Sequence, residues 1–218
     1  GGRGPGAAIG GDAAGAGVRP GSRTRLKLRA DVWARVAAVM DRRWLELYAV
    51  EVYEVGKPWA EADGDIREAI DFLLFYAQQM RLMGRPKLTQ HVLGEESYQH
   101  YWPRGVALVI APWNFPIAIL CGMVSAAIVT GNTVIMKPAE PSSVTGAPLL
   151  EMFEEAGAPP GVPNYLPGHG PVIGQHLGDQ TAVVRIACPG SRAVGLRVGE
   201  SRGRTRPAAV SKRCRTML

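Results

Sequence analysis

The longest uncharged stretch of the chain, residues 105–136, divides into apolar runs separated by turn-forming residues. Residues 105–111 are apolar and end at a proline, a pattern typical of a strand buried on both faces. Residues 115–130 form a longer apolar segment, and a Gly-Asn pair separates it from a second run rich in β-branched residues, 133–136. The pattern predicts a strand, a helix and a second, parallel strand.

Two polar side chains of this region lie at the predicted strand ends. Asn114 follows the first strand and Lys137 follows the second. Ligands of open parallel sheets bind outside the carboxyl ends of the strands, so both residues are candidates for a site. A buried strand–helix–strand unit without a site fits the pattern equally well. A membrane span fits poorly, because the unbroken apolar part, residues 117–130, is shorter than the roughly 20 residues required.

Upstream of this unit, the spacing of apolar residues predicts two amphipathic helices. The first ends near Gly56, and its apolar face consists of Trp33, Val36, Ala37, Met40, Trp44, Leu47 and Tyr48. Asp63 and Asp65 suit the start of the second helix and Gly84 its end. Its apolar face consists of Ile66, Ala69, Ile70, Leu73, Ala77 and Met80. Residues 91–102 alternate loosely and predict an exposed strand, which would need a partner.

A glycine-rich segment, GHGPVIG at 168–174, follows a predicted strand over residues 162–166 and opens a predicted helix over 171–177. Pro171 suits the first position of that helix. The glycine spacing differs from the G-x-G-x-x-G fingerprint of dinucleotide-binding turns. On spacing alone, a structural turn and a cofactor contact are equally compatible with this segment.

Four motifs together resemble the aldehyde dehydrogenase superfamily in order and spacing: PWNFP at 112–116, GNTVIMKPAE at 131–140, PGHGPVIG at 167–174 and PGSRAVG at 189–195. Residues 51–80 resemble the matching helices of its 1-pyrroline-5-carboxylate (glutamate-semialdehyde) dehydrogenase branch. The resemblance implies an α/β fold in which N-terminal helices precede a partial Rossmann-like parallel sheet of the cofactor domain. The catalytic domain would be absent from these residues.

The resemblance also implies residue roles. Asn114 would form the oxyanion hole, and an amide donor on a turn can stabilise negative charge on a carbonyl oxygen. Lys137 and Glu140 would hold the adenosine ribose of NAD; NADP is possible, although a carboxylate beside the ribose disfavours a 2′-phosphate. The other implied cofactor contacts are Ile110, Ala111, Pro112, Trp113, Gly170, Pro171, Gly174, Gly190, Ser191 and Val194.

Catalysis in this superfamily needs a cysteine nucleophile and a glutamate that activates water. Both would lie outside the matched residues, so we expect this chain alone to be inactive. Cys121 falls in the apolar helix, Cys188 takes the place of an aromatic residue in a family turn, and Cys214 lies in an unmatched tail. Pro189 removes a backbone donor where the cofactor would approach.

The net charge of +6 is distributed unevenly, with +5 in residues 1–30, −5 in 31–196 and +6 in 197–218. Basic tails bind polyanions without specificity, but no aromatic residues interleave with these arginines, so a specific nucleic-acid reader is not predicted. The resemblance divides the chain into an unmatched segment 1–29, a partial dinucleotide-binding domain 30–198 with an oligomerisation-arm strand near 88–104, and an unmatched tail 199–218. We expect both ends to arise from out-of-frame translation or a misplaced gene boundary.

The three cysteines lack paired spacing and no N-terminal signal segment is evident, which predicts a reduced, cytoplasmic protein. No metal-spaced cluster is found in the sequence. The predicted function is that of a fragment of an NAD(P)-dependent dehydrogenase that oxidises glutamate γ-semialdehyde to glutamate in proline degradation. Its partners would be a small aldehyde and, at full length, further copies of itself, with no membrane. The alternatives are another aldehyde dehydrogenase and a non-catalytic dinucleotide-binding or interaction module.

Overall fold

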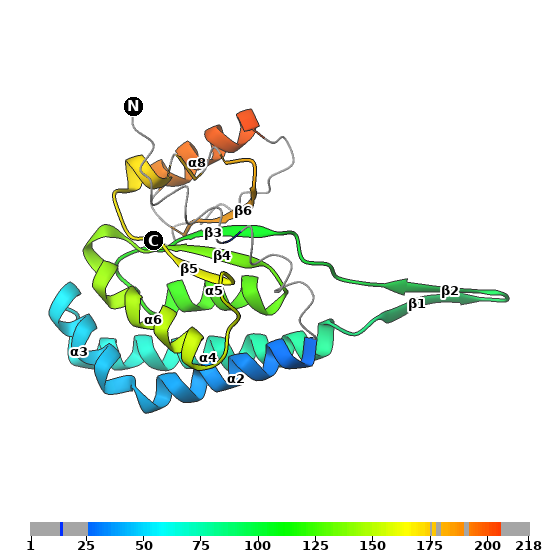
Figure 1. Cartoon of the computed structure of the whole chain (residues 1–218), viewed down its shortest axis with the longest axis horizontal. Coiled ribbons are helices and arrows are strands. Elements are labelled where there is room, and N and C mark those ends of the chain that lie inside the picture. The colour runs from blue at the N-terminus through cyan, green and yellow to red at the C-terminus, as the bar shows by residue number, and fades with distance from the viewer. Residues whose placement is uncertain (1–13, 15–25, 175, 178–179, 190–191, 206–218) are drawn as a thin grey trace.

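A four-stranded parallel sheet forms the centre of the molecule (Figure 1). The computed structural model describes residues 14, 26–174, 176–177, 180–189 and 192–205. In spatial order β5-β4-β3-β6, the strands are Pro163–Tyr165, Thr133–Lys137, Val106–Ile110 and Val183–Ala187. The chain therefore runs outward from β3 through β4 to β5 and then returns to the other side of β3. The predicted α/β class and the parallel pairing of β3 with β4 are confirmed.

Helices cover the sheet on both sides (Figure 1). Two of them lie directly against one face, α5 (Ala118–Val129) and α6 (Ser143–Glu155). A second layer beneath these consists of α2 (Leu26–Arg42), α3 (Trp44–Val55) and α4 (Trp59–Met83). The last described helix, α8 (Arg192–Thr205), lies on the opposite side. Because α5 packs between the sheet and α4, it is apolar on nearly all sides, as expected for a fully buried helix.

The N-terminal helices differ from the prediction in two ways. The single helix expected from Trp33 to Gly56 is two helices, because helical structure lapses at Arg43. The Arg43 guanidinium lies 3.1 Å from Glu151 Oε2 and 3.2 Å from Glu155 Oε2, two carboxylates of α6 that are distant in sequence. Hydrophobic spacing continues across the break and therefore did not reveal it.

The start of α4 is also earlier than predicted. The helix begins at Trp59, and the carbonyl oxygen of Pro58 accepts hydrogen bonds from the amides of Glu61 and Ala62. The prediction that Asp63 and Asp65 mark the helix start is wrong. Asp65 is 1% exposed and lies on the buried face of the helix, where its carboxylate accepts hydrogen bonds from the amides of Ile117 and Ala118.

The expected exposed strand is a β-hairpin, β1 (Lys87–Val92) and β2 (Glu95–Gln99), that projects away from the sheet (Figure 1). Gly94 in its two-residue turn has a φ of 85°, a left-handed conformation that favours glycine. Nearly all residues of both strands are exposed. The prediction of an exposed element is confirmed, and its use in oligomerisation stays a prediction.

Both predicted boundaries near the chain ends fall within packed or regular structure. Ala14, in the segment 1–29, is fully buried beside the sheet, and its carbonyl oxygen accepts a hydrogen bond of 2.8 Å from Thr133 Oγ1. Helix α8 continues across the boundary placed after residue 198. Neither boundary thus coincides with a break in the structure, and the division of the chain into three parts stays a prediction.

Two glycines in helices offer a matched test of the packing between α4 and α5. A Cβ atom at Gly122 would lie 2.8 Å from Phe72 Cδ2, whereas a Cβ atom at Gly64 would meet nothing within 4 Å. We expect Gly122→Ala to lower the free energy of unfolding by about 1 kcal/mol through overpacking. Gly64→Ala should raise it by about 0.5–1 kcal/mol, because alanine restricts the unfolded chain. Urea unfolding followed by circular dichroism measures both, and an equal effect at the two positions would contradict the close packing at Gly122.

Candidate functional site

The candidate site lies at the carboxyl edge of the sheet, where the strand order reverses. The chain leaves β3 toward α5 on one face and leaves β6 toward α8 on the other (Figure 1). Such a reversal opens a crevice at the strand ends, the usual ligand position in this kind of sheet. The loops that follow β3, β4 and β5 carry Asn114, Glu140 and Gly170, respectively.

The loop between β3 and α5 presents polar and aromatic side chains at this edge. Its first residue, Ala111, is buried and donates its amide to the carbonyl oxygen of Lys137 at 3.1 Å, which joins the ends of β3 and β4. Trp113 is 58% exposed and Asn114 is also exposed. The predicted helix start at residue 115 is three residues early, since 115–117 belong to this turn. The amide of Asn114 is therefore accessible to a ligand at the strand ends.

Lys137 ends β4 and is 3% exposed. Its Nζ donates a hydrogen bond of 2.8 Å to the carbonyl oxygen of Pro138. Burial lowers the pKa of Lys137, while nearby Glu140 and Cys188 act in the opposite direction. The cationic group is thus buried at the end of β4, close enough to Glu140 for the two charges to interact.

Glu140 begins η1 (Glu140–Ser142) and joins this loop to the glycine-rich segment. Its Oε1 accepts a hydrogen bond of 2.7 Å from the Gly170 amide, and its Oε2 lies 3.0 Å from His169 Nδ1. The Gly170 amide, with His169 and Lys137 adding to it, lowers the pKa of Glu140. The carboxylate is therefore ionised at neutral pH and remains partly exposed.

The glycine-rich segment forms a single π-helical turn, η2 (Gly170–Gly174), which contains Pro171 and Gly174. This differs from the predicted start of a helix at Pro171, because Gly170 already belongs to the turn. The interaction between His169 and Glu140 was not predicted. A histidine beside two glycines carries no local signal for a partner 29 residues earlier.

Some of the remaining predicted contacts lie at the same edge of the sheet. Ile110 ends β3 opposite Lys137, and Pro112 follows it half-buried. Val194 lies on α8 and is 39% exposed. Gly190 and Ser191 lie outside the described residues, so the turn before α8 has no structural description. The predicted site is thus assembled from the ends of β3, β4 and β5.

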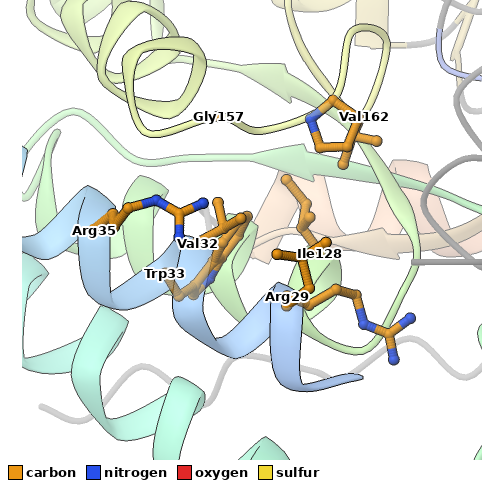
Figure 2. Close-up of a pocket in the computed structure, with 9 residues that line it drawn as sticks. Arg29, Val32, Trp33, Arg35, Ile128, Gly157 and Val162 are labelled. Carbon is orange, nitrogen blue, oxygen red and sulfur yellow. The ribbon is translucent and has the colours of Figure 1, made fainter. Parts of the chain in front are cut away.

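A separate pocket of about 110 Å³ lies at the opposite, amino edge of the sheet (Figure 2). It brings α2 together with the end of α5 and the segment before β5. Its lining is Leu28, Arg29, Val32, Trp33, Arg35, Ile128, Gly157, Pro159 and Val162. None of the predicted site residues lines it, and one of its cations, Arg35, donates to the carbonyl oxygen of Ala156 at 3.0 Å.

The described part of the chain contains neither a metal site nor a membrane-spanning helix. Among those residues, no group of three or more His, Cys, Asp and Glu side chains is placed to hold a metal ion. None of the helices there combines the length and apolarity that crossing a membrane would require.

Comparisons with known proteins agree with the fold described above. The chain is 44% identical over 189 residues to 1-pyrroline-5-carboxylate dehydrogenase of Anoxybacillus flavithermus, covering 87% of this chain and 37% of that protein. The crystal structure of 1-pyrroline-5-carboxylate dehydrogenase from Thermus with bound NAD matches with a TM-score of 0.85 and 42% identity, covering 93% of this chain and 39% of that one. Proline utilization A from Bdellovibrio bacteriovorus matches with a TM-score of 0.88 and 47% identity, covering 89% of this chain and 20% of that one.

The family model of the aldehyde dehydrogenases matches residues 9–212. The match extends into both segments that the sequence analysis left unassigned. The chain nevertheless spans only 37% of the length of the curated relative above. Because the family match covers nearly its whole length, this chain belongs to the aldehyde dehydrogenase family.

Proposed function

We propose that this chain acts within a longer protein that oxidises glutamate γ-semialdehyde to glutamate with NAD. One observation carries the proposal: the exposed amide of Asn114 lies on the loop after β3, Lys137 ends the adjacent strand β4, and Glu140 follows it. The proposed oxyanion donor and the proposed cofactor contacts would thus lie at neighbouring strand ends. The relatives named 1-pyrroline-5-carboxylate dehydrogenase support the choice of substrate.

The residues of the carboxyl edge fit a dinucleotide. Glu140 offers an ionised, partly exposed acceptor for a ribose hydroxyl, and the buried Lys137 beside it would supply the cationic donor. When bound, NAD would supply the hydride acceptor. The carboxylate of Glu140 would repel a 2′-phosphate, so we propose NAD rather than NADP as the cofactor. A bound NAD in the Thermus relative supports this choice.

Asn114 would contribute to the chemical step itself. Attack of a nucleophile on an aldehyde places negative charge on the carbonyl oxygen, and the amide N–H of Asn114 would donate to it. A donor on a fixed turn needs no reorganisation at that moment, which is why such donors lower barriers substantially. We propose that the cysteine nucleophile and the glutamate base lie outside these 218 residues. We also propose that the exposed hairpin β1–β2 joins copies of the full-length protein.

Substrate discrimination in the full-length protein tests this function. We expect kcat/KM for glutamate γ-semialdehyde to exceed that for propanal by about 100-fold or more, because a site that binds an amino acid group rejects analogues lacking it. NAD should be preferred to NADP. NADH formation followed by absorbance measures both.

Two other outcomes would favour the alternatives. Equal kcat/KM values for the two aldehydes would indicate a different aldehyde dehydrogenase. Saturable NAD binding without any turnover would indicate a non-catalytic dinucleotide-binding module.

A further inference from the structure

The two helices that follow the site loops begin without side-chain caps of their own. Helix α5 starts after the loop of Asn114, with Ile117 at its N-cap, and α6 starts after Glu140, with Ser142 at its N-cap. Neither N-cap residue makes a side-chain cap hydrogen bond. The first amides of a helix have no partner within the helix, so other groups must accept from them.

At α5, the acceptor is a carboxylate from another helix. Asp65, from α4, is 1% exposed. Its Oδ2 accepts a hydrogen bond of 3.1 Å from the Ile117 amide, and its Oδ1 one of 3.2 Å from the Ala118 amide. These amides lie three and four residues after Asn114. Asp65 therefore fixes the end of the turn that presents Asn114.

Lys57 also contacts this turn. The Lys57 Nζ lies 4.2 Å from the centroid of the Phe115 ring, and Phe115 follows Asn114 directly. It also lies 3.5 Å from Asp65 Oδ2 and 3.0 Å from Oε1 of Glu51, which is fully buried. Phe115 and Ile117 are thus both in contact with one buried charge cluster, consisting of Glu51, Lys57 and Asp65. Residues 115–117 have little freedom to shift.

At α6, the equivalent group is Glu54 of α3. Its Oε1 accepts a hydrogen bond of 2.7 Å from the Val144 amide. Its Oε2 accepts from both the amide and the hydroxyl of Thr145. These contacts fix the first turn of α6, which follows Glu140 and the rest of η1 directly.

We propose that α3 and α4 are positioning elements for the site, with Asp65 setting the position of Asn114 and Glu54 that of Glu140. The proposal rests on the function proposed above. Both carboxylates act through other residues and touch neither substrate nor cofactor. Misplacing a catalytic group by about 1 Å costs on the order of 100-fold in rate, so loss of either contact should be measurable.

The two carboxylates should affect different kinetic constants of the full-length enzyme. In Asp65→Asn the side chain keeps its size, but its NH₂ group cannot accept from one of the two amides. We expect kcat to fall about 10- to 100-fold, with KM for NAD changed less than twofold. In Glu54→Gln we expect KM for NAD to rise about tenfold, with kcat largely retained. Asp31→Asn is the matched control, because Asp31 forms a surface ion pair with Arg81 away from both loops.

A wild-type enzyme that turns over while Asp65→Asn retains its kcat would overturn the positioning role and leave the proposed function standing. An inactive wild type would instead refute the proposed function. In that case, hydrogen exchange at the Ile117 and Ala118 amides decides the positioning role: it should accelerate in Asp65→Asn and not in Asp31→Asn. If Asp65→Asn does not fold, Glu54→Gln decides the proposal, since Glu54 is only half-buried; an unchanged KM for NAD in that variant would overturn it.

Discussion

Replacing Trp33 by alanine should lower the free energy of unfolding by about 3–5 kcal/mol, because it removes a large side chain from the main core. Trp33 is 2% exposed and stacks on Phe153 of α6 at a centroid distance of 5.4 Å. Its Nε1 also donates a hydrogen bond of 3.2 Å to the carbonyl oxygen of Ser125 in α5. One side chain of α2 thus contacts both α5 and α6, the two helices that lie against this face of the sheet. Urea unfolding followed by circular dichroism gives the change in stability.

Two further substitutions define the origin of that loss. Trp33→Phe keeps an aromatic ring beside Phe153 and should cost less, about 1–2 kcal/mol for the lost hydrogen bond and volume. Trp102→Ala is the control, because Trp102 is 80% exposed and should change stability by less than about 0.5 kcal/mol. A loss below 1 kcal/mol for Trp33→Ala would show that the N-terminal helices are not part of the sheet's core.

Replacing Asn114 by alanine in the full-length enzyme should lower kcat by a factor of about 10²–10³, as loss of one oxyanion donor does elsewhere. KM for NAD should change little, because the proposed ribose contacts come from the loop after β4. Asn114 is exposed, so the fold should be unaffected. Steady-state kinetics with glutamate γ-semialdehyde measure the change.

The isosteric variant Asn114→Asp separates donor chemistry from volume. It has the size of asparagine, but an ionised carboxylate cannot donate and would repel the developing oxyanion. We therefore expect its kcat to be at least as low as that of Asn114→Ala. Near-normal turnover in both variants would exclude Asn114 from the oxyanion hole.

The elements β3, α5 and β4 could be predicted from the sequence, because each is an apolar run bounded by turn-forming residues. The apolar runs and the Gly-Asn break predicted β3, α5 and β4 to within three residues at each end. The break at Arg43 could not be predicted in this way, because two of its three ion-pair partners, Glu151 and Glu155, are more than 100 residues away. Asp65 was misinterpreted for the same reason. An acidic residue in this position suggests the start of its own helix, but its hydrogen-bond partners are amides at the start of α5, more than 50 residues later.

The candidate site shows a similar division. Asn114 and Lys137 were identifiable because polar residues stand out at the ends of apolar strands. The contact of Glu140 with Gly170 and His169 depends on how the loops after β4 and β5 meet, which no spacing within either loop records. Glu51 and Lys57 gave no signal either, since charged residues near a helix end usually face solvent. Here Lys57 lies within 3.5 Å of both carboxylates, and burial together with Asp65 raises the pKa of Glu51 to about 8, which favours a proton on Glu51 and leaves Lys57 to balance Asp65.

The most direct test of this account is a crystal structure of the full-length protein with NAD bound. We predict the dinucleotide at the carboxyl edge of the sheet, with adenosine ribose hydroxyls within hydrogen-bond distance of Lys137 and Glu140. A dinucleotide at the amino edge of the sheet, or one whose ribose contacts neither Lys137 nor Glu140, would contradict it.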